Sequence, residues 1–174
     1  MQKTYLCIDL KSFYASVECV ELGLDPFKVN LVVADPTRGG GAITLAATPA
    51  IKKLGVPSRG RIFEIDSSIE YMIAPPRMHL YMEYSCKVYK VFLEFIAKED
   101  IHVYSVDEAF LDVTDYLSMY QTDARSLAQR ILQDILSTTG ITATCGIGSN
   151  LYLAKIALDI TAKHASDFIG CLDE

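Results

Sequence analysis

The sequence lacks the marks of a membrane or secreted protein. No apolar run approaches the roughly 18 consecutive residues that suggest a membrane-spanning helix. The N-terminus has no signal-peptide layout, because Asp9 and Lys11 interrupt the apolar residues there. The five cysteines are odd in number and no two have C-x-x-C spacing, which argues against a disulfide framework and against a zinc site. We therefore expect a cytoplasmic protein that does not associate with membranes.

Positive charge is also scarce. The chain has 16 lysine and arginine residues against 22 aspartate and glutamate residues, a net charge of −6. Phosphate binding needs a basic surface, so this balance argues against a protein that grips nucleic acid on its own. Repeats and low-complexity segments are absent. With 51% hydrophobic residues over 174 positions, the chain is predicted to be globular, with one domain or one domain carrying an inserted lobe.

Hydrophobic periodicity predicts the order of the secondary-structure elements. Strands are expected at residues 4–10, 29–34, 42–47, 101–106, 109–114 and 141–147. Helices are expected at residues 12–22, 78–97, 124–137 and 150–161, with a short one from Pro49 to near Gly55. Ser12 and Ser149 are the predicted N-caps, and residues 35–41 are predicted to form a loop.

Without residues 15–77, the remaining elements follow a β-α-β-β-α-β order. This order predicts an α+β fold of the ferredoxin-like type, in which residues 15–77 form a small inserted lobe. The first and second strands should run parallel, with the third between them and antiparallel to both. Asp9 at the end of the first strand would then meet Asp107 and Glu108, which lie between the second and third strands, at one edge of the sheet.

Carboxylates crowded in this way resist ionisation unless a cation neutralises them. Their hard oxygen ligands suit Mg²⁺ or Mn²⁺. The alternative is that each acid is a solvated loop end. The combination favours a metal site, because Asp107 and Glu108 interrupt the otherwise apolar segment HVYSVDEAFLDV.

Several segments together resemble one enzyme family. CIDLKSFYASVE and YSVDEAFLDVT resemble the two acidic motifs of Y-family, lesion-bypass DNA polymerases of the impB/mucB/samB type. TCGIGSNLYLAKIALDITAKH is similar to the palm strand and helix that follow, and LGVPSRGRIFEI to part of the fingers. These matches occur in order over nearly the whole chain, and they are most similar to the UmuC-like UV-damage repair branch.

The resemblance implies a role for each matching residue. Asp9, Asp107 and Glu108 would hold two Mg²⁺ ions, or Mn²⁺, with the backbone carbonyl of Leu10 completing a metal shell. The same residues would be the catalytic carboxylates of template-directed nucleotidyl transfer from dNTPs.

Four further residues are implied to bind the substrate. Tyr14 matches an aromatic steric gate against the ribose 2′-hydroxyl, with Phe13 beside it, and Lys155 matches a lysine that contacts the triphosphate. An ordinary packing role for Tyr14 and a solvated surface position for Lys155 are the alternatives. Where the family often has a tyrosine and an arginine, this sequence has Pro49 and Lys52, and of these two only Lys52 can contact the triphosphate.

The resemblance also implies a division into lobes. Residues 1–14 and 78–165 would form the palm, residues 15–77 the fingers, and residues 166–174 the start of a thumb. The remaining thumb and the little finger, which grip DNA through its phosphates, are absent from the sequence. Expected partners are damaged primer-template DNA and dNTPs, with a sliding clamp or a recombinase contacted through the missing region.

The leading interpretation is therefore the catalytic portion of a DNA polymerase for repair and SOS-type damage tolerance, weak or inactive on its own. A non-catalytic, polymerase-like accessory module is the main alternative, favoured by the acidic composition and disfavoured by the three carboxylates. A nucleotidyl cyclase would use a similar palm, but the fingers-like insertion and Tyr14 favour a polymerase.

Overall fold

The computed structural model describes residues 3–172, which divide into two units. Residues 3–10 and 84–172 form the first unit, and residues 11–83 form the second. The sequence pattern predicted that these divisions fall after residues 14 and 77. It also separated residues 166–174, whereas strand β8 (Ile169–Leu172) pairs with the sheet of the first unit. Residues 1–2 and 173–174 lie outside the described part of the chain.

The first unit is built on a five-stranded sheet with the order β5-β6-β1-β7-β8. Strand β6 lies between β1 and β5 and is antiparallel to both, so β1 and β5 run parallel as the sequence predicts. Strand β7 is antiparallel to β1 and parallel to β8. The ferredoxin-like α+β prediction is confirmed. The other strands of this sheet are β1 (Tyr5–Leu10), β5 (Ile101–Val103), β6 (Glu108–Asp112) and β7 (Ala143–Gly148).

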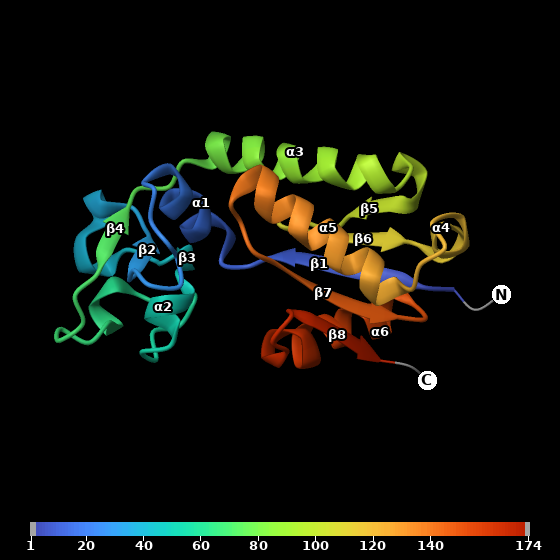
Figure 1. Ribbon diagram of the computed structural model, residues 1–174. Helices are drawn as coiled ribbons and strands as arrows, with labels where there is room; N and C mark the ends of the chain where they lie inside the picture. The colour runs from blue at the N-terminus through green and yellow to red at the C-terminus, as the bar shows by residue number, and fades with distance from the viewer. Residues whose placement is uncertain (1–2, 173–174) are drawn as a thin grey trace. The chain divides into compact units, whose positions relative to one another are not determined.

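Helices cover both faces of this sheet (Figure 1). Ile8 and Leu10 face α3, and together with Val88 they line a cavity of about 30 Å³. Cys7 and the opposite face pack against α6. None of the helices within residues 3–172 is long and apolar enough to cross a membrane. The helices that belong wholly or partly to this unit are α3 (Met78–Phe95), η3 (Lys98–Asp100), α4 (Thr114–Met119), α5 (Ala124–Thr139), α6 (Leu151–Ile156), the π-helix η4 (Ala157–Thr161) and η5 (Ala162–His164).

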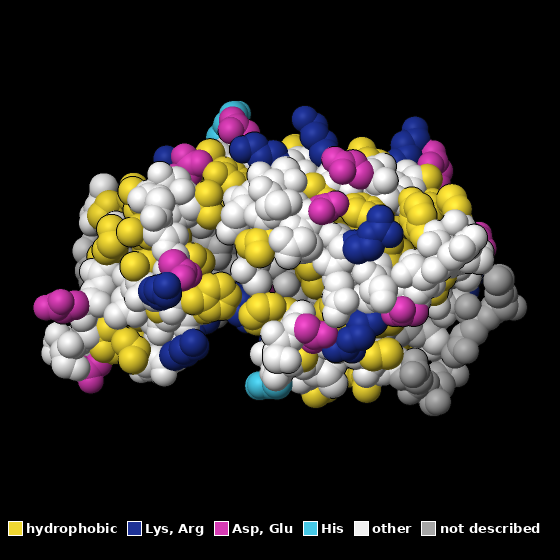
Figure 2. Space-filling view, viewed as in Figure 1, with side chains coloured by type: hydrophobic (Ala, Val, Ile, Leu, Met, Phe, Trp, Pro, Cys, Tyr) yellow, Lys and Arg dark blue, Asp and Glu magenta, His cyan; other side chains and the backbone are white. Residues whose placement is uncertain are grey.

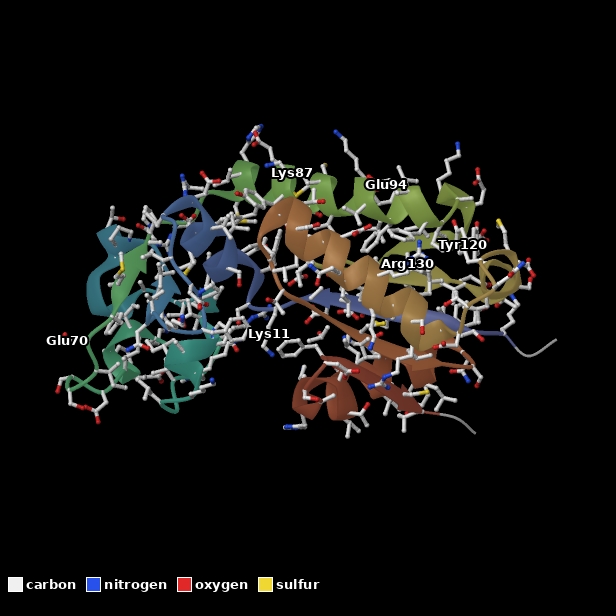
Figure 3. All side chains as sticks on the ribbon, viewed as in Figure 1. Lys11, Glu70, Lys87, Glu94, Tyr120 and Arg130 are labelled. Atoms are coloured by element: carbon white, nitrogen blue, oxygen red, sulfur yellow. The ribbon has the colours of Figure 1, made fainter. Side chains whose placement is uncertain are left out.

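Helix α5 is tied to its neighbours by one arginine. The Arg130 guanidinium lies 5.6 Å from the ring centre of Phe95 and 6.0 Å from that of Tyr120. Arg130 and Tyr120 are labelled in Figure 3. Cations over aromatic faces are attracted by the ring quadrupole. Lys87 and Glu94, labelled in the same view, are exposed on α3. The contact therefore links α5 to the end of α3 on one face of the sheet.

Helix α6 approaches strand β7 closely because the strand carries glycine at the contact. A Cβ built on Gly146 would collide with the backbone of Ala154 and Leu158, and one built on Gly148 would collide with Leu153. Only a residue without a side chain allows the two backbones to come so near. This approach fixes the position of α6 over the face of the sheet that carries Asp9.

The second unit contains a three-stranded sheet of order β3-β2-β4, with β2 antiparallel to β3 and parallel to β4. Val32, Ala47, Ile51 and Val56 form a buried apolar cluster within it. The strand expected at residues 42–47 is regular only at its end, and the loop expected at residues 35–41 is a 3₁₀-helix. The elements are α1 (Phe13–Glu21), β2 (Leu31–Val33), η1 (Pro36–Gly41), β3 (Ala46–Ala47), α2 (Pro49–Lys52), η2 (Ile62–Glu64) and β4 (Met72–Ala74).

Two predicted helix caps differ from the structure. Ser12 precedes α1 but has a φ of 50° and makes no capping hydrogen bond. Its hydroxyl instead accepts a hydrogen bond from Lys52 at 2.9 Å. The cap of α6 is Asn150, whose side chain accepts from the Leu153 N–H at 2.8 Å. The prediction of Ser149 was wrong by one residue, because an amide oxygen can cap a helix as well as a hydroxyl can.

Candidate metal-binding carboxylate site

Three predicted carboxylates meet at one end of the first unit's sheet. Asp9 in β1 and Glu108 in β6 are directly opposite each other in the antiparallel register. Opposed residues on neighbouring strands present their side chains on the same face. The Leu10 N–H donates to the Asp107 carbonyl at 2.9 Å, which holds Asp107 beside the end of β1. The topology therefore brings together acids that are about a hundred residues apart in sequence.

The carboxylates on this face lie next to a buried apolar layer. Cys7 precedes Asp9 by two residues in β1, and Phe110 follows Glu108 by two in β6, so each pair shares the face. Cys7 and Phe110 pack with Ala154 and Leu158 of the α6 region. Asp9 and Glu108 are consequently half-buried at the border of this layer rather than fully solvated.

One lysine from α6 reaches into the carboxylate site. The Lys155 Nζ lies 2.7 Å from Glu108 Oε1 and 3.5 Å from Asp159 Oδ2. The Cys7 thiol also donates to Glu108 Oε1, at 3.3 Å. Asp107 accepts a hydrogen bond from the Ser105 hydroxyl at 2.8 Å. The sequence pointed to Lys155 but missed Cys7, although Cys7 lies two residues from Asp9 and therefore on the same face of the strand.

The surroundings of Asp9 shift the pKa of its carboxyl group. Burial, together with the negative charges of Asp107 and Glu108, raises the pKa of Asp9 from 3.8 to about 7, against the opposing charges of Lys155 and Lys163. A carboxyl group with this pKa is ready to exchange its proton for a cation. Such a perturbed group at one end of a sheet is typical of a functional site.

The three carboxylates are of the right chemical type to bind a hard divalent cation, but their side chains do not converge on one point. Asp9, Asp107 and Glu108 supply the oxygen ligands that Mg²⁺ and Mn²⁺ prefer. Nevertheless, within residues 3–172 no three His, Cys, Asp or Glu side chains already form a group that could hold a metal. Glu108 is instead turned to Lys155. The oxygen ligands and the negative charge of the three side chains suit a divalent cation. In the structure the Lys155 ammonium supplies positive charge at Glu108.

The remaining predicted substrate residues divide between the units. Leu10 is buried at the end of β1 in the first unit. Phe13, Tyr14 and Lys52 belong to the second unit. There the ring of Tyr14 stacks on Tyr81, with ring centres 4.4 Å apart and planes inclined by 15°. Tyr14 is half-buried, and the steric-gate and packing interpretations of it both remain predictions.

The stacked partner of Tyr14 is itself held by a buried charge. Tyr81 is fully buried, and its hydroxyl donates to Glu18 Oε1 at 2.6 Å. Arg77 donates to both oxygens of the same carboxylate. Glu18 follows Tyr14 by four residues, so both lie on one face of α1. The sequence analysis missed this group, and the spacing of four is the signal that could have revealed it.

The surface charge agrees with the composition. On the side of each unit that Figure 2 shows, lysine and arginine side chains are interspersed with aspartate and glutamate side chains. Non-specific affinity for DNA comes mostly from lysine and arginine at phosphates. These sides therefore offer little to hold a duplex.

Comparison with known proteins identifies the motifs. The profile of the impB/mucB/samB family matches residues 8–159. The chain is 38% identical over 170 residues to the UV-damage repair protein UvrX of Bacillus subtilis (strain 168). This alignment covers 97% of this chain and 39% of UvrX. It is 36% identical over 178 residues to DNA polymerase IV 2 of the same organism, covering 98% of this chain and 41% of the relative.

The fold has solved counterparts as well. The crystal structure of DinB from Sulfolobus solfataricus matches with a TM-score of 0.80 and 29% identity, over 98% of this chain and 48% of DinB. The chain thus spans about two fifths of the length of the two curated relatives and about half of DinB. These matches confirm the resemblance and the palm-type α+β fold, and the three named proteins give the accessory-module alternative no support.

Proposed function

Because the chain belongs to the impB/mucB/samB family, we propose that it is the catalytic portion of a Y-family, lesion-bypass DNA polymerase. Such an enzyme would add nucleotides from dNTPs to a primer opposite damaged template DNA, in the cytoplasm and as part of SOS-type damage tolerance. The observation that carries the proposal is the cross-strand pair of Asp9 and Glu108 with Asp107 beside it. Contacts with a sliding clamp or a recombinase would belong to parts of such polymerases beyond these 174 residues.

In this proposal the chain's own residues hold and orient the reactants. Asp9, Asp107, Glu108 and the Leu10 carbonyl would hold two divalent ions, Mg²⁺ or Mn²⁺. When bound, such ions lower the pKa of an attacking hydroxyl and neutralise the charge that develops on a leaving pyrophosphate. The raised pKa of Asp9 supports this assignment, since burial and the negative charges of Asp107 and Glu108 disfavour the ionised carboxylate and a bound cation would favour it.

The substrate-binding roles are proposed residue by residue. Lys155 and Lys52 would contact the triphosphate as point charges. Tyr14, backed by Phe13, would exclude the ribose 2′-hydroxyl. The stacking of Tyr14 on a fully buried tyrosine supports a rigid gate, because the ring cannot turn aside without losing that contact.

The proposal also gives names to the two units. The first unit, with the carboxylates, would be the palm, and the second would be the fingers. The functional boundary between palm and fingers would fall after residues 14 and 77 rather than at the limits of the two units, since Phe13 and Tyr14 would contact a nucleotide held at the palm carboxylates.

The test is nucleotide binding together with primer extension by the 174-residue chain. A dNTP should bind in the presence of Mg²⁺, Asp107→Asn should abolish that binding, and Glu94→Gln, which removes an exposed acid from α3, should not. The absence of Mg²⁺-dependent dNTP binding would contradict the catalytic proposal.

We expect extension itself to be weak. The chain has 16 basic residues against 22 acidic ones, so it should bind the DNA phosphates weakly. A loosely held primer would be poorly positioned, and in-line transfer is sensitive to errors of about 1 Å in the position of the attacking group. Robust extension at low salt that Asp107→Ala abolishes would show that this charge argument is wrong while leaving the catalytic proposal intact.

A further inference from the structure

Lys155 is bound to the carboxylate site more firmly than a surface lysine would be. Its Nζ contacts Glu108 Oε1 at 2.7 Å, and the Glu108 side chain is only 10% exposed. Burial lowers the pKa of Lys155, but the hydrogen bond to Glu108 and the nearby carboxylate charges more than offset this, so the pKa is raised. The contact therefore places a positive charge directly on Glu108.

The Oε1 oxygen of Glu108 already accepts from two donors, one for each of its lone pairs. A carboxylate oxygen has two lone pairs. Lys155 Nζ and Cys7 Sγ both donate to Oε1 of Glu108. A cation that takes this oxygen as a ligand must therefore displace one of the two donors. The ammonium is the one whose charge the cation repels.

We propose that Lys155 is the internal counter-ion of the carboxylate site, competing with a divalent cation for Glu108 and released from Glu108 when the cation binds. The inference rests on the proposed cation site and adds to it a competition that sets cation affinity. In the metal-free chain the ammonium neutralises a buried carboxylate that would otherwise be costly to leave unpaired. Once released, the ammonium becomes available to a phosphate of the nucleotide.

A neighbouring lysine provides a matched control. Lys163 also lowers the pKa of Asp9 through its charge. Its Nζ, however, lies 3.3 Å from Asp159 Oδ1 and is bound there rather than at Glu108. Replacing either lysine by methionine removes one positive charge near the site and keeps an unbranched side chain. Only the Lys155 replacement removes the competitor for Glu108.

The first experiment is a calorimetric Mn²⁺ titration of the whole chain without nucleotide. Lys155→Met should tighten Mn²⁺ binding about tenfold, and Lys163→Met should tighten it less than about threefold. Lys155→Arg keeps the charge and should bind Mn²⁺ about as the unaltered chain does. Equal effects of the two methionine variants, or weaker binding by Lys155→Met, would overturn the proposal.

The second experiment follows the ammonium directly in the unaltered chain, so it does not depend on a variant that folds. An ammonium in a buried ion pair exchanges its protons slowly enough to give a lysine ¹⁵Nζ signal in NMR spectra. The Lys155 signal, assigned by its loss in Lys155→Arg, should shift or disappear on titration with Mg²⁺. A signal that stays unchanged when calorimetry shows the site saturated with Mg²⁺ would refute the release.

One further variant separates this inference from the proposed function. Asp9→Asn should abolish Mn²⁺ binding if the carboxylates form the cation site. Unaltered Mn²⁺ binding by Asp9→Asn would refute the site itself and the inference with it. Loss of binding in Asp9→Asn, combined with no effect of Lys155→Met, would refute only the competition.

Discussion

Asp9→Asn is predicted to stabilise the metal-free chain at pH 8 and to destroy its response to divalent cations. Asparagine keeps the shape of the side chain and removes its charge. Within residues 3–172 the Asp9 carboxylate accepts no hydrogen bond, and the Thr144 hydroxyl donates to the Asp9 backbone carbonyl instead, so the substitution removes little besides that charge. A functional carboxylate that lowers stability is the expected result of placing acids together for binding rather than for folding.

The magnitude follows from the pKa of Asp9. The folded chain holds this pKa at about 7, whereas the unfolded chain has the ordinary value near 3.8. Because the folded state keeps the proton over this range, the contribution of Asp9 to stability is highest below about pH 4 and falls as the pH rises to about 7. At about 1.4 kcal/mol per pH unit, the ionised side chain costs at most about 4 kcal/mol at pH 8 and less than about 2 kcal/mol at pH 5.

The assay is urea unfolding with EDTA present, at pH 5 and at pH 8. Urea is preferred to guanidinium because it does not screen charges. Asp9→Asn should raise the free energy of unfolding by at least about 2 kcal/mol at pH 8 and by clearly less at pH 5. Glu94→Gln, which neutralises an exposed acid on α3, should change it by less than about 0.5 kcal/mol at either pH.

Divalent cations complete the test. Ligand binding to the folded state stabilises it in proportion to the logarithm of the ligand concentration above Kd. Millimolar Mn²⁺ should therefore stabilise the unaltered chain at pH 8 and leave Asp9→Asn unchanged. If Asp9→Asn is destabilised at pH 8, or if its effect is the same at both pH values, the crowded-carboxylate argument is wrong.

Three other substitutions test the packing and the sugar gate. Tyr14→Ala, in a form of the protein that extends primers, should raise ribonucleotide incorporation without changing Mn²⁺ affinity; unchanged sugar selectivity would assign Tyr14 to packing alone. Tyr81→Phe keeps the stacked ring but removes a donor from the buried Glu18, and chemical unfolding should show a loss of about 1–3 kcal/mol. Gly146→Ala should cost at least about 2 kcal/mol because its Cβ collides with the α6 backbone, whereas Gly41→Ala, with open space around it, should be nearly neutral; similar unfolding midpoints for both would contradict the close approach of α6.

The local sequence pattern was sufficient to predict most of the helices and strands of the first unit. Strand β1 and helices α3 and α5 appear within a few residues of their predicted ends, because their apolar spacing is regular and long enough to identify each period. The order of these elements, with the rules for chain crossings, also predicted that β6 lies between β1 and β5. From that topology the meeting of Asp9 with Glu108 followed directly.

Short and irregular elements were less predictable. Strand β3 is confined to Ala46–Ala47, and residues 36–41 form a 3₁₀-helix where a loop was predicted. Strand β8 was not predicted, since IGCL is too short to show a period and is defined by pairing with β7. Elements of this kind depend on a neighbour supplied by distant parts of the chain.

By itself, then, the sequence determined which residue types reach the end of the sheet: the order of the elements and the rules for chain crossings bring Asp9 beside Asp107 and Glu108. Only the tertiary structure decided the register that puts Asp9 opposite Glu108, and the partners of these side chains. The ion pair between Lys155 and Glu108, the thiol of Cys7 on the same oxygen, and the glycine contact that brings α6 near all join segments far apart in the sequence. Such contacts depend on distances of a few tenths of an ångström between packed backbones, and residue periodicity carries no information on that scale.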